Sequence, residues 1–438
     1  NSQFAIRNSQ FAIRNSQFVT RNSLYMRNRV VITGLGALTP IGNNVEAYWQ
    51  NLLNGVSGAA PIKQFDVSKF KTQFACELKD FKASDYLDRR TLQRTDPVIQ
   101  YAMIAADEAA KDARLDEIED RDTMGVFWAS GIGGIQSIYQ EIEQYIANQK
   151  TPRFAPLLVP KMIVDAPAGQ LSIRHRLKGA TAAIVTACAS SSHALGMALD
   201  QIRVGRAKVM LVGGSEAALT DVGLGAFSAL GALSKRNDDP TRASRPFDQN
   251  RDGFVIGEGA GALVLEEYEH AKARGAKIYA ELVGAGLCGD AYHLTAPDPS
   301  GEGAARGMLL ALKDAGLTTA DIDHINTHST STPLGDEMET KAIALAFGEA
   351  AYALNISGTK SMTGHLLGAA GAIEAVATVL SIRDQIVPPT INLDDVDEQI
   401  DPRFNLTPNK AQRRQIRAAM SNNFGFGGHN ASVVFKQV

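Results

Sequence analysis

Cysteine is scarce in this chain, with three residues in 438, namely Cys76, Cys188 and Cys288. So few cysteines, so far apart, do not form a disulfide framework, and they fit a reducing compartment. Long apolar runs are also missing, because glycine, hydroxyl and charged residues interrupt every apolar stretch before the roughly 20 residues that a membrane-spanning helix needs. The two absences argue against a disulfide-stapled secreted domain and a membrane protein, so we expect a cytoplasmic protein.

An excess of either charge is missing too. Lys and Arg number 44 and Asp and Glu number 47, which gives a formal net charge of −3. This balance argues against a nucleic-acid-binding surface spread over the chain. What the chain has is length and apolar content: 438 residues, 45% of them hydrophobic, suggest two to three domain-sized units with a large core.

The first 27 residues differ from the rest. They repeat the heptad NSQFAIR and carry arginines without any acid, at Arg7, Arg14, Arg21 and Arg27. Their apolar residues lie two apart, which is the wrong spacing for a coiled coil. We interpret residues 1–27 as a low-complexity tail outside the fold, or as a translated upstream segment in which case Met26 is the start. The alternative is a transit peptide, which would place the protein in the plastid stroma.

Beyond the tail, strand-like and helix-like patterns alternate, which is typical of an α/β protein with covered sheets. RVVITGLG from Arg29 and YAELVGAG from Tyr279 each run from a strand into glycine, and suggest that an N-terminal half, 28–276, is repeated in a C-terminal half, 277–438. The patterns predict helices over Val45–Leu53, Pro97–Asp112, Cys188–Val204, Ala304–Ala315, Asp336–Phe347 and Leu366–Arg383, and strands over Met124–Ala129, Ala182–Thr186, Lys208–Gly213, Gly261–Glu266, Ile278–Gly286, Ile322–Thr327 and Ala431–Phe435.

Several segments match common functional motifs only in part. The glycine-rich segment 34–42 lacks one glycine of the dinucleotide fingerprint, since Thr39 stands there. Gly-Thr-Lys-Ser at 358–361 lacks the residue order of a phosphate-binding loop. His324 and His328 are four residues apart but end an expected strand, so they do not share a helix face as zinc ligands would. These failures exclude the corresponding nucleotide-binding and metalloprotease sites.

Among the three cysteines, the surroundings of Cys188 favour a role as a catalytic nucleophile. It follows an apolar strand and stands among small residues in VTACASSSHALG, at the expected start of a helix. A helix N-terminus carries about half a positive charge and free N–H groups. We therefore expect the pKa of this thiol to be lowered, and the N–H groups to stabilise an oxyanion. A structural cysteine is the alternative here, and it is the interpretation that we prefer for Cys76 and Cys288.

Two histidines and a glycine-rich segment have similar surroundings. His328 follows an expected strand and precedes hydroxyl residues, and such strand-end loops commonly carry chemistry in α/β proteins. His365 stands between Gly364 and a helix start rich in small residues. In NNFGFGGHNAS, residues 422–432, glycines let the backbone approach a ligand closely. Each feature alone also fits a structural histidine or a tight turn, but together with Cys188 they indicate a nucleophilic site.

The motifs VTACASSSHALG, KSMTGHLLGAAG, VPPTINLD and NNFGFGGHN occur in the order found in the β-ketoacyl-acyl-carrier-protein synthases. The chain resembles this family over about residues 28–438, and the segment 244–282 makes it most similar to the long-chain elongating type, synthase II. The resemblance implies a thiolase-type, five-layered αβαβα fold built from two βαβαβαββ halves. It also implies a homodimer, with acyl carrier protein as the partner.

The resemblance assigns site residues as well. It implies that Cys188, His328 and His365 form the reactive centre, and that Lys360 and Glu374 set the charge and orientation of the imidazoles. A second set of residues matches positions that line the pantetheine channel, the gate or the acyl pocket in relatives: Thr295, Thr330, Thr332, Phe426 and Ile132.

The implied reaction is a decarboxylative Claisen condensation. The Cys188 thiolate takes the acyl chain from its carrier, while the N–H groups of Cys188 and Phe426 hold the oxyanion. A malonyl carrier then loses CO₂, His328 and His365 stabilise the enolate, and the carbanion attacks the acyl-cysteine to give a β-ketoacyl product two carbons longer. We expect no metal and no other cofactor, because decarboxylation drives the step.

Some positions depart from the family pattern. Thr327 and Ser329 replace a common alanine and glycine around His328, and His429 replaces a frequent threonine. Gly231 stands where some relatives carry an arginine that docks the acidic carrier. Carrier docking must then use other cations, for which the sequence offers two groups: Arg89, Arg90 and Arg94, or Lys235 and Arg236.

Four alternative functions share parts of this pattern. A degradative thiolase relies on a second cysteine near the C-terminus, and no cysteine follows Cys288. A type III synthase has asparagine where His365 stands, and a chain-length-factor subunit lacks the nucleophile that Cys188 provides. A polyketide-type synthase keeps all the reactive residues and remains open.

Overall fold

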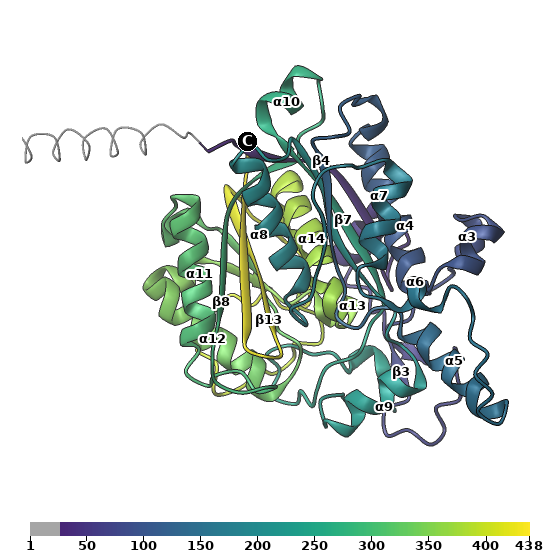
Figure 1. Ribbon diagram of the computed structural model, residues 1–438. Coiled ribbons are helices and arrows are strands. Elements are labelled where there is room, and N and C mark those ends of the chain that lie inside the picture. Colours follow the sequence, from purple (N-terminus) through teal and green to yellow (C-terminus); the bar gives the residue numbers. More distant parts are fainter. Residues whose placement is uncertain (1–26) are drawn as a thin grey trace, which may run out of the picture.

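Residues 27–438 are described by a computed structural model, whose centre is one continuous ten-stranded sheet (Figure 1). The order of its strands is β10-β9-β13-β14-β8-β1-β7-β6-β4-β5. Their bounds are β1 (Val30–Leu38), β4 (Met124–Ala129), β5 (Thr181–Ile184), β6 (Val209–Glu216), β7 (Gly259–Glu267), β8 (Ala280–Gly289), β9 (His324–Asn326), β10 (Asn355–Ser357), β13 (Ala418–Gly425) and β14 (His429–Lys436). Two short pairs lie outside it: β2 (Ala60–Pro61) with β3 (Phe74–Ala75), and β11 (Ile386–Val387) with β12 (Gln412–Arg413).

The helices lie between and beside these strands. Their bounds are α2 (Val45–Leu53), α3 (Arg89–Arg94), α4 (Pro97–Asp112), α5 (Ile135–Ala147), α6 (Leu158–Met162), α7 (Ala166–His175), α8 (Ser190–Arg203), α9 (Asp221–Ala229), α10 (Tyr268–Ala273), α11 (Glu302–Ala315), α12 (Pro333–Phe347), α13 (Lys360–Thr363) and α14 (Ala370–Asp384). No helix in the described residues is long and apolar enough to cross a membrane.

The two halves of the sheet have the same topology. Within each half, numbered in chain order, the strands read 3-2-4-5-1, as β5-β4-β6-β7-β1 and as β10-β9-β13-β14-β8. The halves meet where β1 pairs antiparallel with β8, at Val31 with Glu281 and at Ile32 with Ala280. The expected repetition of a βαβαβαββ unit is thereby confirmed.

Two helices fill the space between the halves. Helix α14 packs against β7 of the first half and β13 of the second, while α8 packs against β6 and β8. Helix α4 covers the outer face of the first half, and α11 covers that of the second, with α12 beside it (Figure 1). The result is the expected succession of five αβαβα layers. Helix α14 is buried from Ala370 to Ile382, and its residues are mostly small or apolar on every side apart from Glu374, Thr378 and Ser381.

Several expected elements are confirmed with the same bounds, namely α2, α4 and β4. Their local signals are strong: the side chain of Asn44 caps α2 and that of Asp96 caps α4, which also has proline in its first turn. The expected start of a helix at Cys188 is wrong, because α8 begins at Ser190. Ala187 has a φ of +50°, which no helix continues, so Cys188 lies in a turn before the helix.

The expected tail lies outside the described residues, except for Arg27. The guanidinium of Arg27 donates to the carboxylate of Asp314 at 2.7 Å. Arg203 donates to the same carboxylate at 2.5 Å. The start of the described chain is therefore tied to α11 by a shared ion pair.

Glu258 is a fully buried carboxylate without a cation beside it among the described residues. It accepts hydrogen bonds from Gln64 Nε2 at 2.7 Å, from the Leu78 N–H at 3.1 Å and from the Tyr101 hydroxyl at 3.1 Å. Burial raises the pKa of Glu258 to about 7, although these donors act in the opposite direction.

We predict that the stability of Glu258→Gln relative to wild type rises as the pH is raised from about 4.5 to 7. Between the ordinary value of 4.5 and the folded-state pKa of about 7, the unfolded chain is ionised at this group and the folded chain is protonated, so stability falls as pH rises. Glutamine keeps the hydrogen bonds and carries no charge. Urea unfolding at several pH values should show that the free energy of unfolding of the variant, relative to that of wild type, rises by about 1 kcal/mol per pH unit in this window. A constant difference would contradict the prediction.

Candidate active site

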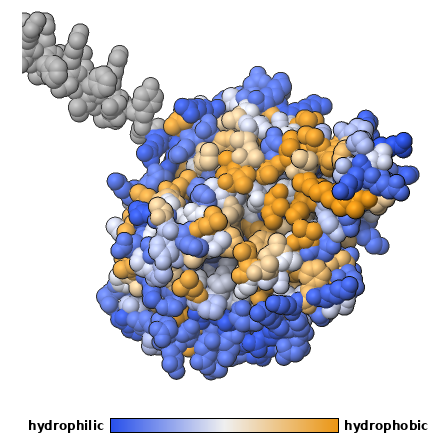
Figure 2. Space-filling model, turned by 60° about the horizontal axis from the view of Figure 1, so that its bottom comes forward, coloured by the Kyte–Doolittle hydropathy of each residue, from blue (hydrophilic) through white to orange (hydrophobic). Residues whose placement is uncertain are grey.

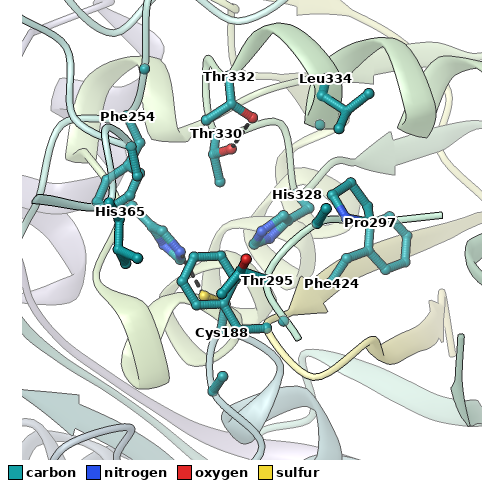
Figure 3. A pocket seen from close by; sticks show the side chains of 18 of the residues that line it. Cys188, Phe254, Thr295, Pro297, His328, Thr330, Thr332, Leu334, His365 and Phe424 are labelled. Carbon is teal, nitrogen blue, oxygen red and sulfur yellow. Dashed lines mark hydrogen bonds between the residues drawn. The ribbon is translucent and has the colours of Figure 1, made fainter. Parts of the chain in front are cut away.

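A cavity of about 630 Å³ brings together the reactive side chains that the sequence indicated (Figure 3). Cys188 lies between β5 and α8, His328 follows β9, and His365 lies between α13 and α14. All three side chains line the cavity and point toward one another. Residues that are up to 177 positions apart in the chain thus form one cluster.

The duplicated topology explains this meeting. Cys188 and His365 occupy equivalent places, because each follows the third strand of its half and precedes the central helix of that half. The loops after the second strands, β4 and β9, are equivalent too, and they carry Ile132 and His328. Since α8 and α14 pack against each other, the two loops before them face the same cavity.

The imidazole of His365 contacts the thiol directly. Its Nε2 lies 3.0 Å from Sγ of Cys188, and its Nδ1 accepts a hydrogen bond from the Leu367 N–H at 3.3 Å. With Nδ1 used as an acceptor, we assign the proton of the neutral ring to Nε2. The ring of His328 stands at 86° to that of His365, with centroids 5.3 Å apart. His365 can therefore donate to a thiolate or to a substrate oxygen at this place.

The expected low pKa of the thiol is wrong. Burial raises the pKa of Cys188 to about 11, and it outweighs the opposite effects of Lys360 and of a hydrogen bond from the Phe426 backbone N–H. Helix α8 starts two residues later than expected, so Cys188 is not part of its first turn. The resting group is a thiol, and attack on a substrate requires that its proton leave.

The two histidines are neutral. Burial lowers the pKa of both His328 and His365 well below the usual value, and the ammonium of Lys360 lowers both further. Lys360 forms a fully buried ion pair with Glu374. Asn423 donates to the other oxygen of Glu374 at 2.7 Å. The arrangement places the positive charge of Lys360, fixed by Glu374, near two uncharged imidazoles.

Two further acids, which the sequence interpretation missed, hold the His328 loop. Glu339 accepts from the backbone N–H groups of His328 at 2.9 Å and of Ser329 at 2.8 Å. Asp336 accepts from the N–H of Ser331 at 3.1 Å. Both acids are buried on α12. The signal was an Asp and a Glu three residues apart on an expected helix, a pattern that also fits a solvated face.

The expected substrate-contacting residues all lie in the cavity wall: Ile132, Thr295, Thr330, Thr332 and Phe426. The hydroxyls of Thr330 and Thr332 are 3.1 Å apart and lie on the side of the cavity opposite Cys188 (Figure 3). Their roles in binding remain predictions.

The two candidate docking groups differ in their distance from the cavity. Arg89, Arg90 and Arg94 lie exposed on α3, and none of them lines the cavity. The backbone N–H of Lys235, by contrast, donates at 3.0 Å to Asp252, which does line it. The structure thus places Lys235 and Arg236 near the cavity and α3 outside it.

The cluster also has the composition of a metal site. Ligand atoms of Cys188, His328 and His365 lie within 4.8 Å of one another. A metal would require the lone pair of Nε2 on His365, yet the Leu367 N–H faces Nδ1 and keeps the proton on Nε2. The donor set is therefore better suited to hydrogen bonding than to holding a metal, and the expected absence of a metal stays a prediction.

Two family models match the chain. The model described as Beta-ketoacyl synthase, N-terminal domain, covers residues 27–271, and that described as Beta-ketoacyl synthase, C-terminal domain, covers residues 279–394. The chain belongs to the β-ketoacyl synthase family. The expected family and the expected acyltransferase activity, that of a condensing enzyme, are confirmed.

Individual relatives agree with the family models. The chain is 49% identical over 415 residues to 3-oxoacyl-[acyl-carrier-protein] synthase 2 of Vibrio harveyi, which covers 94% of this chain and 99% of the relative. It is 49% identical over 410 residues to the enzyme of the same name from Staphylococcus aureus (strain COL), covering 93% of this chain and 98% of the relative.

Solved structures show the same fold. A β-ketoacyl synthase from Burkholderia phymatum STM815 has a TM-score of 0.87 at 37% identity, and the match covers 94% of this chain and all of the other. A type II polyketide ketosynthase, described in complex with its acyl-carrier protein, has a TM-score of 0.86 at 36% identity with the same coverage. These neighbours confirm the thiolase-type fold class.

Proposed function

We propose that this chain elongates an acyl group on an acyl carrier protein by condensing it with a malonyl group on a second carrier, through an acyl-Cys188 intermediate. The observation that carries the proposal is the 3.0 Å approach of His365 Nε2 to the sulfur of Cys188 in a cavity lined mostly by apolar residues. The name 3-oxoacyl-[acyl-carrier-protein] synthase 2, borne by the bacterial relatives, supports the same activity. A cytoplasmic location is part of the proposal.

The first half-reaction is acyl transfer to Cys188. The sulfur attacks the thioester carbon, the bond to the carrier sulfur breaks, and the thiol proton passes to the departing carrier thiolate. The backbone N–H of Phe426, which acts to lower the pKa of the Cys188 thiol, is proposed to donate to the oxyanion. The Nε2–H of His365 stabilises the developing thiolate, which the high pKa of this thiol makes necessary.

The second half-reaction is decarboxylation and condensation. The malonyl C–C bond breaks, CO₂ leaves, and the electron pair remains as an enolate whose oxygen needs donors. The neutral rings of His328 and His365, 5.3 Å apart, supply N–H groups to it. The enolate carbon then attacks the acyl-cysteine, the C–S bond breaks, and the β-ketoacyl carrier leaves. Thr330 and Thr332 are proposed to bind the pantetheine arm above this centre.

A fatty-acid substrate is favoured over a polyketide. Identity is 49% to a relative named 3-oxoacyl-[acyl-carrier-protein] synthase 2, and 36% to the ketosynthase of a type II polyketide system. The test is incubation of the protein with malonyl carrier and a saturated acyl carrier, followed by mass spectrometry of the carrier-bound products. A product two carbons longer is expected. Failure to elongate any saturated acyl carrier would contradict the proposal.

We predict that carrier docking depends on Lys235 and Arg236 more than on α3. The carrier is expected to be acidic, so charge reversal near the cavity should weaken its binding. Lys235→Glu with Arg236→Glu should raise KM for the acyl carrier by about 10-fold with little change in kcat. Arg90→Glu with Arg94→Glu on the exposed α3 is the matched control. An increase in KM confined to the control would move the docking surface to α3.

We further propose a homodimer formed along β5. This strand is an edge of the sheet, and an edge presents unpaired backbone groups to a second strand. Val185, the residue directly after β5, is an exposed apolar side chain, and so is Met197 on the following helix α8. Apolar residues gather on one face of the molecule in Figure 2. Light scattering of the wild-type protein should give twice the mass of one chain. The double variant Val185→Glu with Met197→Glu should give the mass of a single chain. A monomeric wild-type protein would contradict this.

A further inference from the structure

Glu216 is a buried carboxylate at the end of β6 that contacts two separate parts of the cavity wall. Its Oε1 accepts from the Ser130 hydroxyl at 2.9 Å and from the Ile132 N–H at 3.2 Å. Its Oε2 accepts from the N–H of Gly131 at 2.7 Å and from that of Gly368 at 2.9 Å. Four donors from two loops, one in each half of the molecule, thus converge on a single side chain.

These donors belong to segments with different tasks in the proposed reaction. Ser130–Ile132 follows β4 and brings Ile132 into the cavity wall. Gly368 lies three residues after His365 and directly after Leu367, both of which line the same cavity. The carboxylate therefore lies at the junction between the wall of the acyl cavity and the segment that carries an imidazole.

The contact between the two segments leaves no room for side chains. A Cβ on Gly368 would lie 2.3 Å from the Gly131 nitrogen and 2.8 Å from Glu216 Oε2, and one on Gly131 would lie 2.9 Å from the same oxygen. The carbonyl of Gly368 is held from the other side by the Ser191 hydroxyl on α8, three residues after Cys188. The segment after His365 is therefore packed against, and hydrogen-bonded to, both neighbours.

Glu216 has no cationic partner among the described residues, since its hydrogen-bond donors are backbone amides and a hydroxyl. Burial raises its pKa, while the N–H groups of Gly131 and Gly368 act in the opposite direction. Its charge in turn contributes to the raised pKa of Cys188. If Glu216 only held the two loops together, a neutral side chain with the same hydrogen bonds would serve as well. The effect of its negative charge on the pKa of Cys188 therefore gives a test of whether the carboxylate does more.

We propose that Glu216 is a positioning residue that couples the acyl cavity to the condensing centre: by holding the Ile132 loop and the His365 segment on one carboxylate, it makes the rate of condensation depend on how the acyl chain fills the cavity. This inference rests on the proposed function. It predicts that the selectivity among acyl chains, as well as the rate, is lost when the carboxylate is changed.

The test is Glu216→Gln, with Glu258→Gln as the matched control. Both replace a fully buried carboxylate held by neutral donors, but the partners of Glu258 lie outside the cavity wall. The amide of glutamine at 216 keeps one accepting oxygen. With its NH₂ group on the Oε2 side it loses the bonds from the Gly131 and Gly368 N–H groups, and on the Oε1 side it loses the bond from the Ile132 N–H. Either orientation weakens the attachment of one cavity segment to this side chain. We expect kcat for condensation to fall by about 10- to 100-fold, since a displacement of about 1 Å can cost that much. The ratio between the condensation rates with long-chain and with medium-chain acyl carriers should approach one.

A second readout does not depend on condensation. The pH dependence of Cys188 alkylation by iodoacetamide should move to lower pH in Glu216→Gln, because a negative charge near the thiol is removed, and should not move in Glu258→Gln. Glu216→Asp, which keeps the charge but shortens the reach, should flatten the chain-length ratio without this shift, and it serves if the glutamine variant does not fold. Loss of thermal stability with an unchanged ratio and an unchanged alkylation profile would overturn the proposal. A wild-type protein that elongates nothing would instead contradict the proposed function.

Discussion

Cys188→Ala is expected to lower elongation of an acyl carrier by about 10⁴-fold or more, because the acyl-enzyme route disappears with the sulfur. The change removes one small atom from a turn, and the neighbours of Cys188 are themselves alanines, so the fold should be kept. Mass spectrometry of the intact protein after exposure to acyl carrier should show acylation of wild type and none of the variant. Cys76→Ala is the control for thiol chemistry elsewhere, since Cys76 is buried and burial raises its pKa to about 12.

Decarboxylation of the malonyl carrier separates the two half-reactions. His328 and His365 are proposed to stabilise the enolate without help from the sulfur, so Cys188→Ala should still release CO₂ from malonyl carrier. His328→Ala with His365→Ala should lose that release. A Cys188→Ala variant that continued to elongate acyl chains, or a double histidine variant that decarboxylated at the wild-type rate, would contradict the assigned roles.

Lys360→Met is expected to reduce both stability and activity. Lys360 and Glu374 are fully buried partners, and removal of one partner of such a pair leaves an uncompensated charge, which costs about 3–5 kcal/mol. Lys360 also lowers the pKa of His328 and of His365. Its loss raises both values, so the pH at which the imidazoles become neutral should rise, and the acid limb of the kcat profile should move to higher pH.

The double variant Lys360→Met with Glu374→Gln distinguishes the two effects. It contains no unpaired charge, and Asn423 can still donate to the glutamine oxygen, so most of the stability should return. The charge beside the histidines stays absent, and the shifted pH profile should persist. Urea unfolding and pH–rate measurements check this. If activity and its pH profile returned together with stability, Lys360 would be only a structural ion-pair partner.

Much of this molecule could be predicted from local sequence patterns. Helices α2 and α4 combine strong capping residues with a helical period, and β4 is a short apolar run, so their bounds agree with the structure. Strand β13 was missed because its local sequence does not indicate a strand. It contains Ser421, Asn422 and Asn423, which indicate a loop in a single sequence. In the fold these amide side chains are buried, with Ser432 on the neighbouring strand β14 as the partner of Asn422 and Glu374 on α14 as the partner of Asn423.

The reactive residues were predictable because their motifs are long, but their electrostatics were not. The pKa of Cys188 depends on how much of the chain surrounds the turn before α8, and no local pattern reports that burial. Glu339 and Glu216 escaped notice for the same reason, since a carboxylate that binds backbone N–H groups of a loop looks in sequence like any other acid on a helix or at a strand end.

The placement of α8 and α14 has a consequence for any attempt to divide the gene. Helix α14 is enclosed on all sides and contacts strands of both halves, so a fragment ending near residue 276 would lack the partner of α8, and the complementary fragment would expose the surface of α14. Neither piece would hold a complete reactive set, because Cys188 is encoded in one and His328 and His365 in the other. The halves should be inert and prone to aggregate when produced alone, and should recover function only when synthesised in the same cell.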